Sequence, residues 1–137
     1  MNGFSAEKEL HPEDFWAGLD RLIETCPLII DRPRGSTHPR YRDLVYPLDY
    51  GYLEGTSAGD GGGIDVWLGS MGLRRVTGIV CTVDGKKRDA EIKILLDCAE
   101  KENRLILDFL NRGSMRAMLI ERGDGFARAV LPERPVR

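Results

Sequence analysis

The sequence predicts an α+β domain in which a small, closed or half-closed sheet of antiparallel strands is flanked by an N-terminal and a C-terminal helix. Segment 11–26 shows helical spacing of apolar residues, and segment 99–112 is bounded by helix start and stop signals. Between them, short apolar segments within 28–96 are separated by turn residues. Helices that lie outside a run of strands are typical of α+β domains. A length of 137 residues with 42% hydrophobic content suits one domain over 1–137.

The N-terminal helix is predicted over residues 11–26. Pro12 lies near its start, where a missing backbone N–H costs least, and two acidic residues follow in the first turn. Pro27 ends the helix because proline disrupts helical backbone geometry. The apolar residues recur at helical spacing, and they are Phe15, Leu19, Leu22 and Cys26.

Four strands are predicted from apolar segments that are bounded by turn residues. The last two are joined by a turn that begins with Asp84-Gly85, a step that favours a tight hairpin. These four strands are predicted at 28–31, 64–69, 75–83 and 88–96.

The C-terminal helix is predicted over residues 99–112. Asp97 is expected to cap it, Glu100 to complete a capping box, and Gly113 to close its C-terminal end. The residues after Gly113 are expected to form a further strand or a turn of helix.

Composition excludes several classes of protein. The net charge of -2 and the pI near 5.7 give no overall attraction to nucleic acid or to anionic membranes, so nucleic acid is an unlikely partner. Three cysteines without a CxxC pair argue against a disulfide framework and against a structural zinc site. No apolar segment approaches the length that spans a membrane. These features predict a cytoplasmic protein.

Two pairs of aspartates, each five residues apart, are candidate metal ligands. Asp60 and Asp65 flank a run of three glycines, and Asp84 and Asp89 lie on the two sides of the predicted hairpin. Four carboxylates that converge without a cation would repel one another, and bound Mg²⁺ removes this repulsion. The alternative is that these aspartates are ordinary turn residues, since aspartate is common in turns.

A basic, turn-rich segment and three tyrosines are candidate phosphate contacts. Arg40 can bind phosphate oxygens with both arms of its guanidinium group, or it can lie in a solvated loop. Tyr46, Tyr50 and Tyr52 fall on one face of an extended segment. They form a packed face, or their hydroxyls donate to phosphate if that face opens onto a pocket. His38 is either a proton donor or a surface histidine.

Several of these motifs, in the same order, resemble those of the soluble family I inorganic pyrophosphatases. The match covers about residues 28 to 93, about half of the chain. The family has a YPxNYGY-type strand followed by an aspartate-rich DGDPxDV-type loop. The matching segments are Ile30-Asp31-x-Pro33, Pro39-Arg40-Tyr41, Tyr46-Pro47-Leu48-Asp49-Tyr50-Gly51-Tyr52, Asp60-Gly61-x-x-Ile64-Asp65-Val66 and the pair Asp84 and Asp89.

The resemblance implies a fold and an activity. The fold is a five-stranded, oligonucleotide-binding-like closed barrel with flanking helices, whose mouth holds several Mg²⁺ ions and pyrophosphate. The activity is Mg²⁺-dependent hydrolysis of pyrophosphate by a metal-activated water. The family commonly forms homo-oligomers, so a homo-oligomer is expected. Phe109, Leu110, Met115 and Met118 either line its interface or cover the barrel.

The resemblance also implies residue roles. The implied metal ligands are Asp60, Asp65, Asp84 and Asp89. The implied catalytic residues are Asp31, Asp65, Tyr50 and Arg40. The implied substrate contacts are Arg40, Tyr46, Tyr50, Lys93 and Arg112.

The chain departs from the family pattern at positions that matter for catalysis. Gly62 replaces the middle aspartate of the loop, which in the family is a metal ligand and the base expected to deprotonate the attacking water. Glu91 replaces a phosphate-binding lysine, although Lys93 lies on the same strand face. Arg112 is the one anion ligand expected near the end of the C-terminal helix. These changes leave Asp31, Asp49 or a metal-bound hydroxide as candidates to take the place of the missing base.

Three functions are consistent with the sequence. The first is a shortened, Mg²⁺-dependent pyrophosphatase. The second is a hydrolase for another phosphorylated small molecule, because the phosphate ligands have been exchanged. The third is a non-catalytic barrel that binds phosphate compounds or single-stranded nucleic acid through Arg40, Tyr41 and Arg42.

Overall fold

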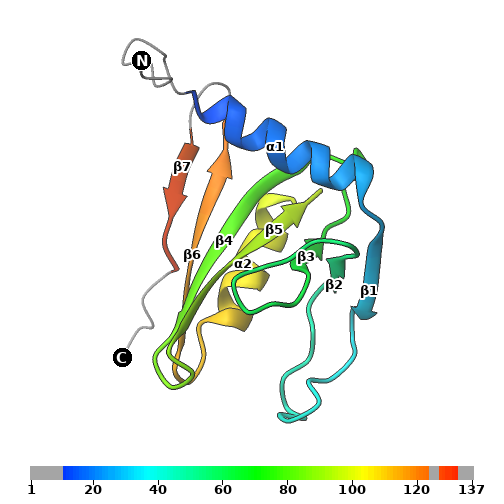
Figure 1. The fold of residues 1–137 in the computed structure, drawn as a ribbon. Helices are drawn as coiled ribbons and strands as arrows, with labels where there is room; N and C mark the ends of the chain where they lie inside the picture. Colours follow the sequence, from blue (N-terminus) through cyan, green and yellow to red (C-terminus); the bar gives the residue numbers. More distant parts are fainter. Residues whose placement is uncertain (1–10, 124–126, 133–137) are drawn as a thin grey trace.

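The computed structural model describes residues 11–123 and 127–132, which form one twisted sheet of seven strands with a helix on each face (Figure 1). The predicted α+β class is confirmed. Both predicted helices form, and each is shorter than its predicted range by one to two residues at its ends. The elements in chain order are α1 (Pro12–Thr25), β1 (Leu28–Arg32), β2 (Asp49–Leu53), β3 (Ile64–Leu68), β4 (Val76–Asp84), β5 (Asp89–Leu96), α2 (Glu100–Leu110), β6 (Met115–Arg122) and β7 (Ala127–Val130).

The sheet differs from the closed, five-stranded antiparallel barrel that was expected. Its strand order is β1-β2-β3-β5-β4-β6-β7, and it is not closed within the described residues. Neighbouring strands are antiparallel except β3 and β5, which are parallel. The open question about the residues after Gly113 is answered by β6, which extends the sheet beyond β4. Because β6 and β7 extend the sheet beyond β4, its two edge strands are β1 and β7, which do not pair with each other.

Alternate residues of the strands face different helices, as the two-residue period of a strand requires. Trp67, Val80 and Leu95 pack with α2 in one core cluster. Val66 and Ile94 pack with α1 in the other. The face on which a strand residue lies therefore decides which helix it meets, and the α2 face also carries the cavity described below.

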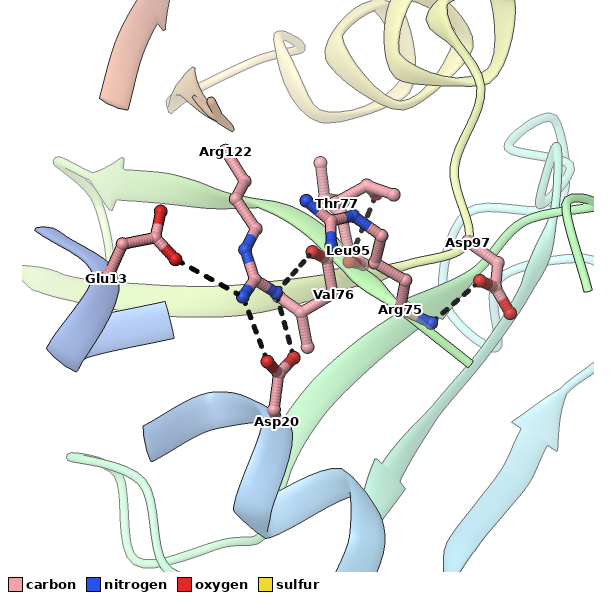
Figure 2. A network of polar contacts seen from close by, with 8 residues as sticks. All are labelled: Glu13, Asp20, Arg75, Val76, Thr77, Leu95, Asp97 and Arg122. Atoms are coloured by element: carbon pink, nitrogen blue, oxygen red, sulfur yellow. Dashed lines mark hydrogen bonds and ion pairs between the residues drawn. The ribbon is translucent and has the colours of Figure 1, made fainter. Parts of the chain in front are cut away.

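A partly buried ion pair attaches α1 to β6 (Figure 2). The guanidinium group of Arg122 donates to both carboxylate oxygens of Asp20 at 2.9 and 3.0 Å, and to the carbonyl of Val76 at 3.2 Å. Glu13 lies 3.9 Å away. A bidentate pair of this kind fixes orientation as well as distance, so it sets where α1 crosses the sheet.

Asp97 does not cap α2, contrary to the sequence prediction. Its backbone φ is 58°, and its buried carboxylate accepts hydrogen bonds from the backbone N–H groups of residues 73, 74 and 75 at 2.9 to 3.1 Å. Three such donors satisfy the carboxylate better than a helix end would. The side chain of Glu102 instead accepts from the N–H of Ala99, which immediately precedes α2.

The three cysteines are free, as expected from their number and spacing. Within 11–123 and 127–132, no helix combines the length and the apolar character needed to cross a bilayer.

Candidate functional site

A cavity of about 820 Å³ lies on the α2 face of the sheet, beside the C-terminal end of that helix. Its walls come from β2, β3, β4 and β5, the β4–β5 turn, the residues after α2 and the connection between β1 and β2. In Figure 1 the β4–β5 turn, the residues after α2 and that connection all lie toward the lower end of the view. Segments far apart in sequence therefore meet at one site.

Most of the residues that the sequence singled out line this cavity. They are Tyr46, Tyr50, Asp60, Asp65, Asp84, Asp89, Lys93 and Arg112.

Asp31 and Arg40 are not among the residues that line the cavity. Asp31 is exposed on β1, where the pairing register with β2 shifts between Ile30 and Arg32. Arg40 is exposed, and its backbone N–H donates to Nδ1 of His38 at 3.0 Å. The order of the motifs predicted that these two residues lie near the site, but it did not define where their side chains point. That direction depends on the irregular pairing of β1 for Asp31 and on the loop conformation for Arg40.

Lys93 lies at the centre of the charged part of the cavity. Its ammonium group donates to Tyr50 Oη at 2.9 Å, to Asp65 Oδ2 at 2.9 Å and to Glu91 Oε2 at 3.2 Å. The residue is 6% exposed. Burial by itself would lower the pKa of Lys93, but the adjacent Tyr50 and Asp65 outweigh burial and raise that pKa, so the lysine is charged at neutral pH. Burial also raises the pKa of Tyr50, whose phenol is neutral.

Glu91 is a cavity residue that was not counted among the site residues. It lines the cavity, and its Oε2 lies 3.2 Å from Lys93 Nζ. A backbone hydrogen bond from Gly62, followed by the contact with Glu91, lowers the pKa of Asp60. The sequence could have identified Glu91 through the two-residue period of β5, because Glu91 and Lys93 lie on the same face of that strand.

Asp84 serves the hairpin as well as the cavity. Its Oδ1 accepts from the N–H groups of Lys86 at 3.0 Å and Lys87 at 3.1 Å, and from the hydroxyl of Ser114 at 2.7 Å. The Ser114 hydrogen bond, with those two N–H groups, lowers the pKa of Asp84. Asp84 therefore holds the β4–β5 turn together, and it also lines the cavity. Asp89 lies opposite Asp84 in the β4–β5 register and is exposed.

The carboxylates around the cavity form an all-oxygen donor set, which suits a hard cation such as Mg²⁺. They do not converge on one point: among residues 11–123 and 127–132, no group of three or more His, Cys, Asp or Glu side chains is arranged to hold one metal ion. The donor chemistry fits Mg²⁺, with ligands distributed around the cavity rather than gathered in a single cluster.

The opposite part of the cavity is aromatic. Tyr46 is the centre of this part: its ring centroid lies 4.8 Å from that of Phe109, 5.6 Å from Tyr50 and 6.3 Å from His38. His38 also contacts Tyr41, with ring centroids 5.1 Å apart. The three tyrosines did not fall together on one open face, since Tyr46 precedes β2 and is buried. Tyr52 does not line the cavity.

Three of the four apolar residues that could line an oligomer interface pack inside the chain. Leu110 is buried in the α2 core cluster, and Met115 packs against that cluster. Phe109 packs there too, and all three line the cavity. A homo-oligomer stays a prediction.

Two glycines of the motifs differ in whether the backbone around them requires glycine. A Cβ on Gly51 would overlap the backbone carbonyl oxygen of Ile29, so close contact between β1 and β2 requires glycine there. A Cβ on Gly62 would have the carboxylate of Asp60 as its nearest neighbour, at 3.5 Å or more, which is ordinary contact. The backbone therefore accepts a side chain at Gly62.

No protein-family model matches this chain, and no curated protein matches it. The likeness to the pyrophosphatases thus rests on the motifs and on their order.

Proposed function

We propose that this protein hydrolyses inorganic pyrophosphate to two phosphates in a Mg²⁺-dependent reaction. The observation that carries the proposal is that four aspartates from separate segments face one cavity together with the buried Lys93 and the partly buried Tyr50. A pyrophosphate anion needs cations that neutralise its charge, which the aspartates would bind, and hydrogen-bond donors that hold its oxygens, which the lysine and the tyrosine would supply.

Asp60, Asp65, Asp84 and Asp89 would hold the Mg²⁺ ions through their carboxylate oxygens. When bound, Mg²⁺ neutralises phosphate charge and lowers the pKa of water.

Lys93 and Tyr50 would bind the phosphate oxygens. Their polar ends lie side by side on the cavity wall, with Nζ and Oη 2.9 Å apart. A charged ammonium group and a neutral phenol are both donors, so both can hold phosphate without losing a proton. Arg112, which is exposed at the edge of the cavity, would contact the outer phosphate. Asp31 and Arg40 have no part in this set because they do not line the cavity.

Glu91 would accept the proton of the attacking water. It supplies a carboxylate beside Asp60, close to the place where Gly62 leaves the family's usual base absent. In the reaction the water oxygen forms a bond to one phosphorus, and the bond from that phosphorus to the bridging oxygen breaks. The bridging oxygen leaves with the second phosphate, and the water proton passes to Glu91 and then to solvent. Positioned bases contribute about 10²- to 10⁴-fold to such rates.

The test is release of inorganic phosphate from pyrophosphate by the purified chain with Mg²⁺. We expect release that stops when a chelator removes Mg²⁺ and is lost in Asp65→Asn. Asp108→Asn is the matched control, since Asp108 is exposed on α2 away from the cavity. No release above background at high protein concentration, or equal release by both variants, would overturn the proposal.

A further inference from the structure

The cavity has a second part that inorganic pyrophosphate does not use. We call the side chains of His38, Tyr41, Tyr46 and Phe109 the aromatic wall; all four line the cavity. The volume of about 820 Å³ falls in the range of about 300–1,000 Å³ that is typical of pockets for drug-sized organic ligands. Pyrophosphate has no apolar surface to place against aromatic rings, so this wall suits a larger ligand.

Tyr41 is the member of the wall with the most accessible ring. It is 54% exposed, whereas Tyr46 is 6% exposed and serves as the base of the wall. Burial, together with the charges of Arg32, Lys87 and Arg40, lowers the pKa of His38, so the imidazole beside Tyr41 is neutral at pH 7. A neutral ring next to an exposed phenol is a surface on which a flat heterocycle can stack.

Tyr50 connects the wall to the charged part of the cavity. Its ring lies 5.6 Å from the ring of Tyr46, and its hydroxyl oxygen lies 2.9 Å from Lys93 Nζ. A ligand that reached from Lys93 along Tyr50 would meet the wall next. Lys86 and Lys87, on the β4–β5 turn, line the same cavity and add positive charge to it.

We propose that the cavity binds a nucleoside 5′-diphosphate, with the diphosphate at Lys93 and Tyr50 and the nucleobase stacked on Tyr41. This inference rests on the proposed phosphoanhydride hydrolysis and identifies a second class of substrate for it. The water oxygen forms a bond to the β-phosphorus, and the bond between that phosphorus and the bridging oxygen breaks. The bridging oxygen leaves with the α-phosphate, which gives a nucleoside monophosphate, inorganic phosphate and a proton.

Binding to non-hydrolysable analogues tests the inference separately from catalysis. The two probes are adenosine 5′-(α,β-methylene)diphosphate and methylenediphosphonate, which have the same bridging carbon and differ by the nucleoside. Both are titrated into the full chain by calorimetry with Mg²⁺ present. Base stacking on an aromatic side chain contributes enough that Tyr41→Ala should weaken binding of the adenosine analogue about ten-fold.

The matched variant is Tyr41→Phe, which keeps the ring and should keep the affinity of the adenosine analogue. Tyr41→Ala should leave the binding of methylenediphosphonate and the hydrolysis of pyrophosphate unchanged. Because Tyr41 is exposed, its truncation removes no core contact. Circular dichroism spectra equal to those of the wild type would verify folding.

The outcomes separate the two proposals. If methylenediphosphonate binds and the adenosine analogue does not, or if Tyr41→Ala weakens both probes equally or neither, the nucleotide inference is overturned and pyrophosphate hydrolysis stands. If neither probe binds and no phosphate is released from pyrophosphate, both proposals are overturned. A ten-fold loss for the adenosine analogue alone supports the nucleotide inference.

Discussion

Replacing Lys93 with methionine removes the cation that lies between the carboxylates of the cavity. The ammonium group is 2.9 Å from Asp65 and 3.2 Å from Glu91, and the side chains of these partners are 29% and 17% exposed. Removing one partner of a buried ion pair costs about 3–5 kcal/mol. Since both carboxylates reach water, we take the lower end, about 3 kcal/mol.

The expected effect is large enough to measure by thermal unfolding. An unfolding entropy of about 2.1 cal/mol/K per residue converts about 3 kcal/mol into a decrease of about 10 °C in Tm for a chain of 137 residues. Mg²⁺ should restore part of this loss, because it replaces the missing cation. A ligand present at about 100 times its Kd adds about 2.7 kcal/mol of stability. Mg²⁺ should therefore raise the Tm of Lys93→Met more than that of the wild type.

The control for Lys93→Met is Lys101→Met, at an exposed position of α2, which should change stability by less than about 0.5 kcal/mol. Two results would refute the reasoning. If Lys93→Met and the wild type have equal Tm without Mg²⁺, the lysine does not offset the carboxylates. If Mg²⁺ shifts both proteins equally, Mg²⁺ does not bind where the ammonium group lies.

Three further substitutions test separate parts of the account. Gly51→Ala should destabilise the protein by about 2 kcal/mol or more in urea unfolding, because the new Cβ overlaps the carbonyl of Ile29. The control is Gly18→Ala, in an open position of α1, which should instead stabilise the protein by about 0.5–1 kcal/mol. Equal effects of the two substitutions would contradict this explanation. Gly62→Asp should increase Mg²⁺-dependent phosphate release at least about ten-fold, because it adds a base to Glu91 at the position where the family carries one and where the backbone has room for a side chain. Unchanged release would argue against a pyrophosphatase-type loop. Because the pKa of Asp84 is lowered in the folded protein, its carboxylate stabilises the fold above the pKa of the unfolded state, and this contribution is lost as the pH falls below about 4. The stability of Asp84→Asn, measured by unfolding at a series of pH values, should therefore decrease less in acid than that of the wild type. Identical pH profiles would contradict this prediction.

The local elements were predictable because local sequence determines them. The helical spacing of apolar residues predicted α1, capping and stop signals predicted α2, and the Asp84-Gly85 step predicted the β4–β5 hairpin. The strand order was not predictable in the same way, because the parallel pairing of β3 with β5 joins segments that are separated by all of β4. The hydrophobic pattern of a segment shows which face of the strand is apolar, but it does not show which strand lies next to it.

The site was predictable where strand geometry directed the side chain. Asp65 and Lys93 lie on one face of adjacent strands, and both line the cavity as their positions indicated. Arg40 lies in a loop whose direction depends on contacts such as its backbone hydrogen bond to His38. Asp97 was assigned to a helix cap because of its place in sequence, but tertiary folding brought three backbone donors of residues 73–75 to its carboxylate.

The most direct test of the central claim is a crystal structure of this protein with Mg²⁺ and methylenediphosphonate. The account predicts metal ions between the diphosphonate and the carboxylates of Asp60, Asp65, Asp84 and Asp89, with Lys93 on a phosphonate oxygen. A cavity without Mg²⁺ under these conditions, or Mg²⁺ bound away from these four aspartates, would contradict it.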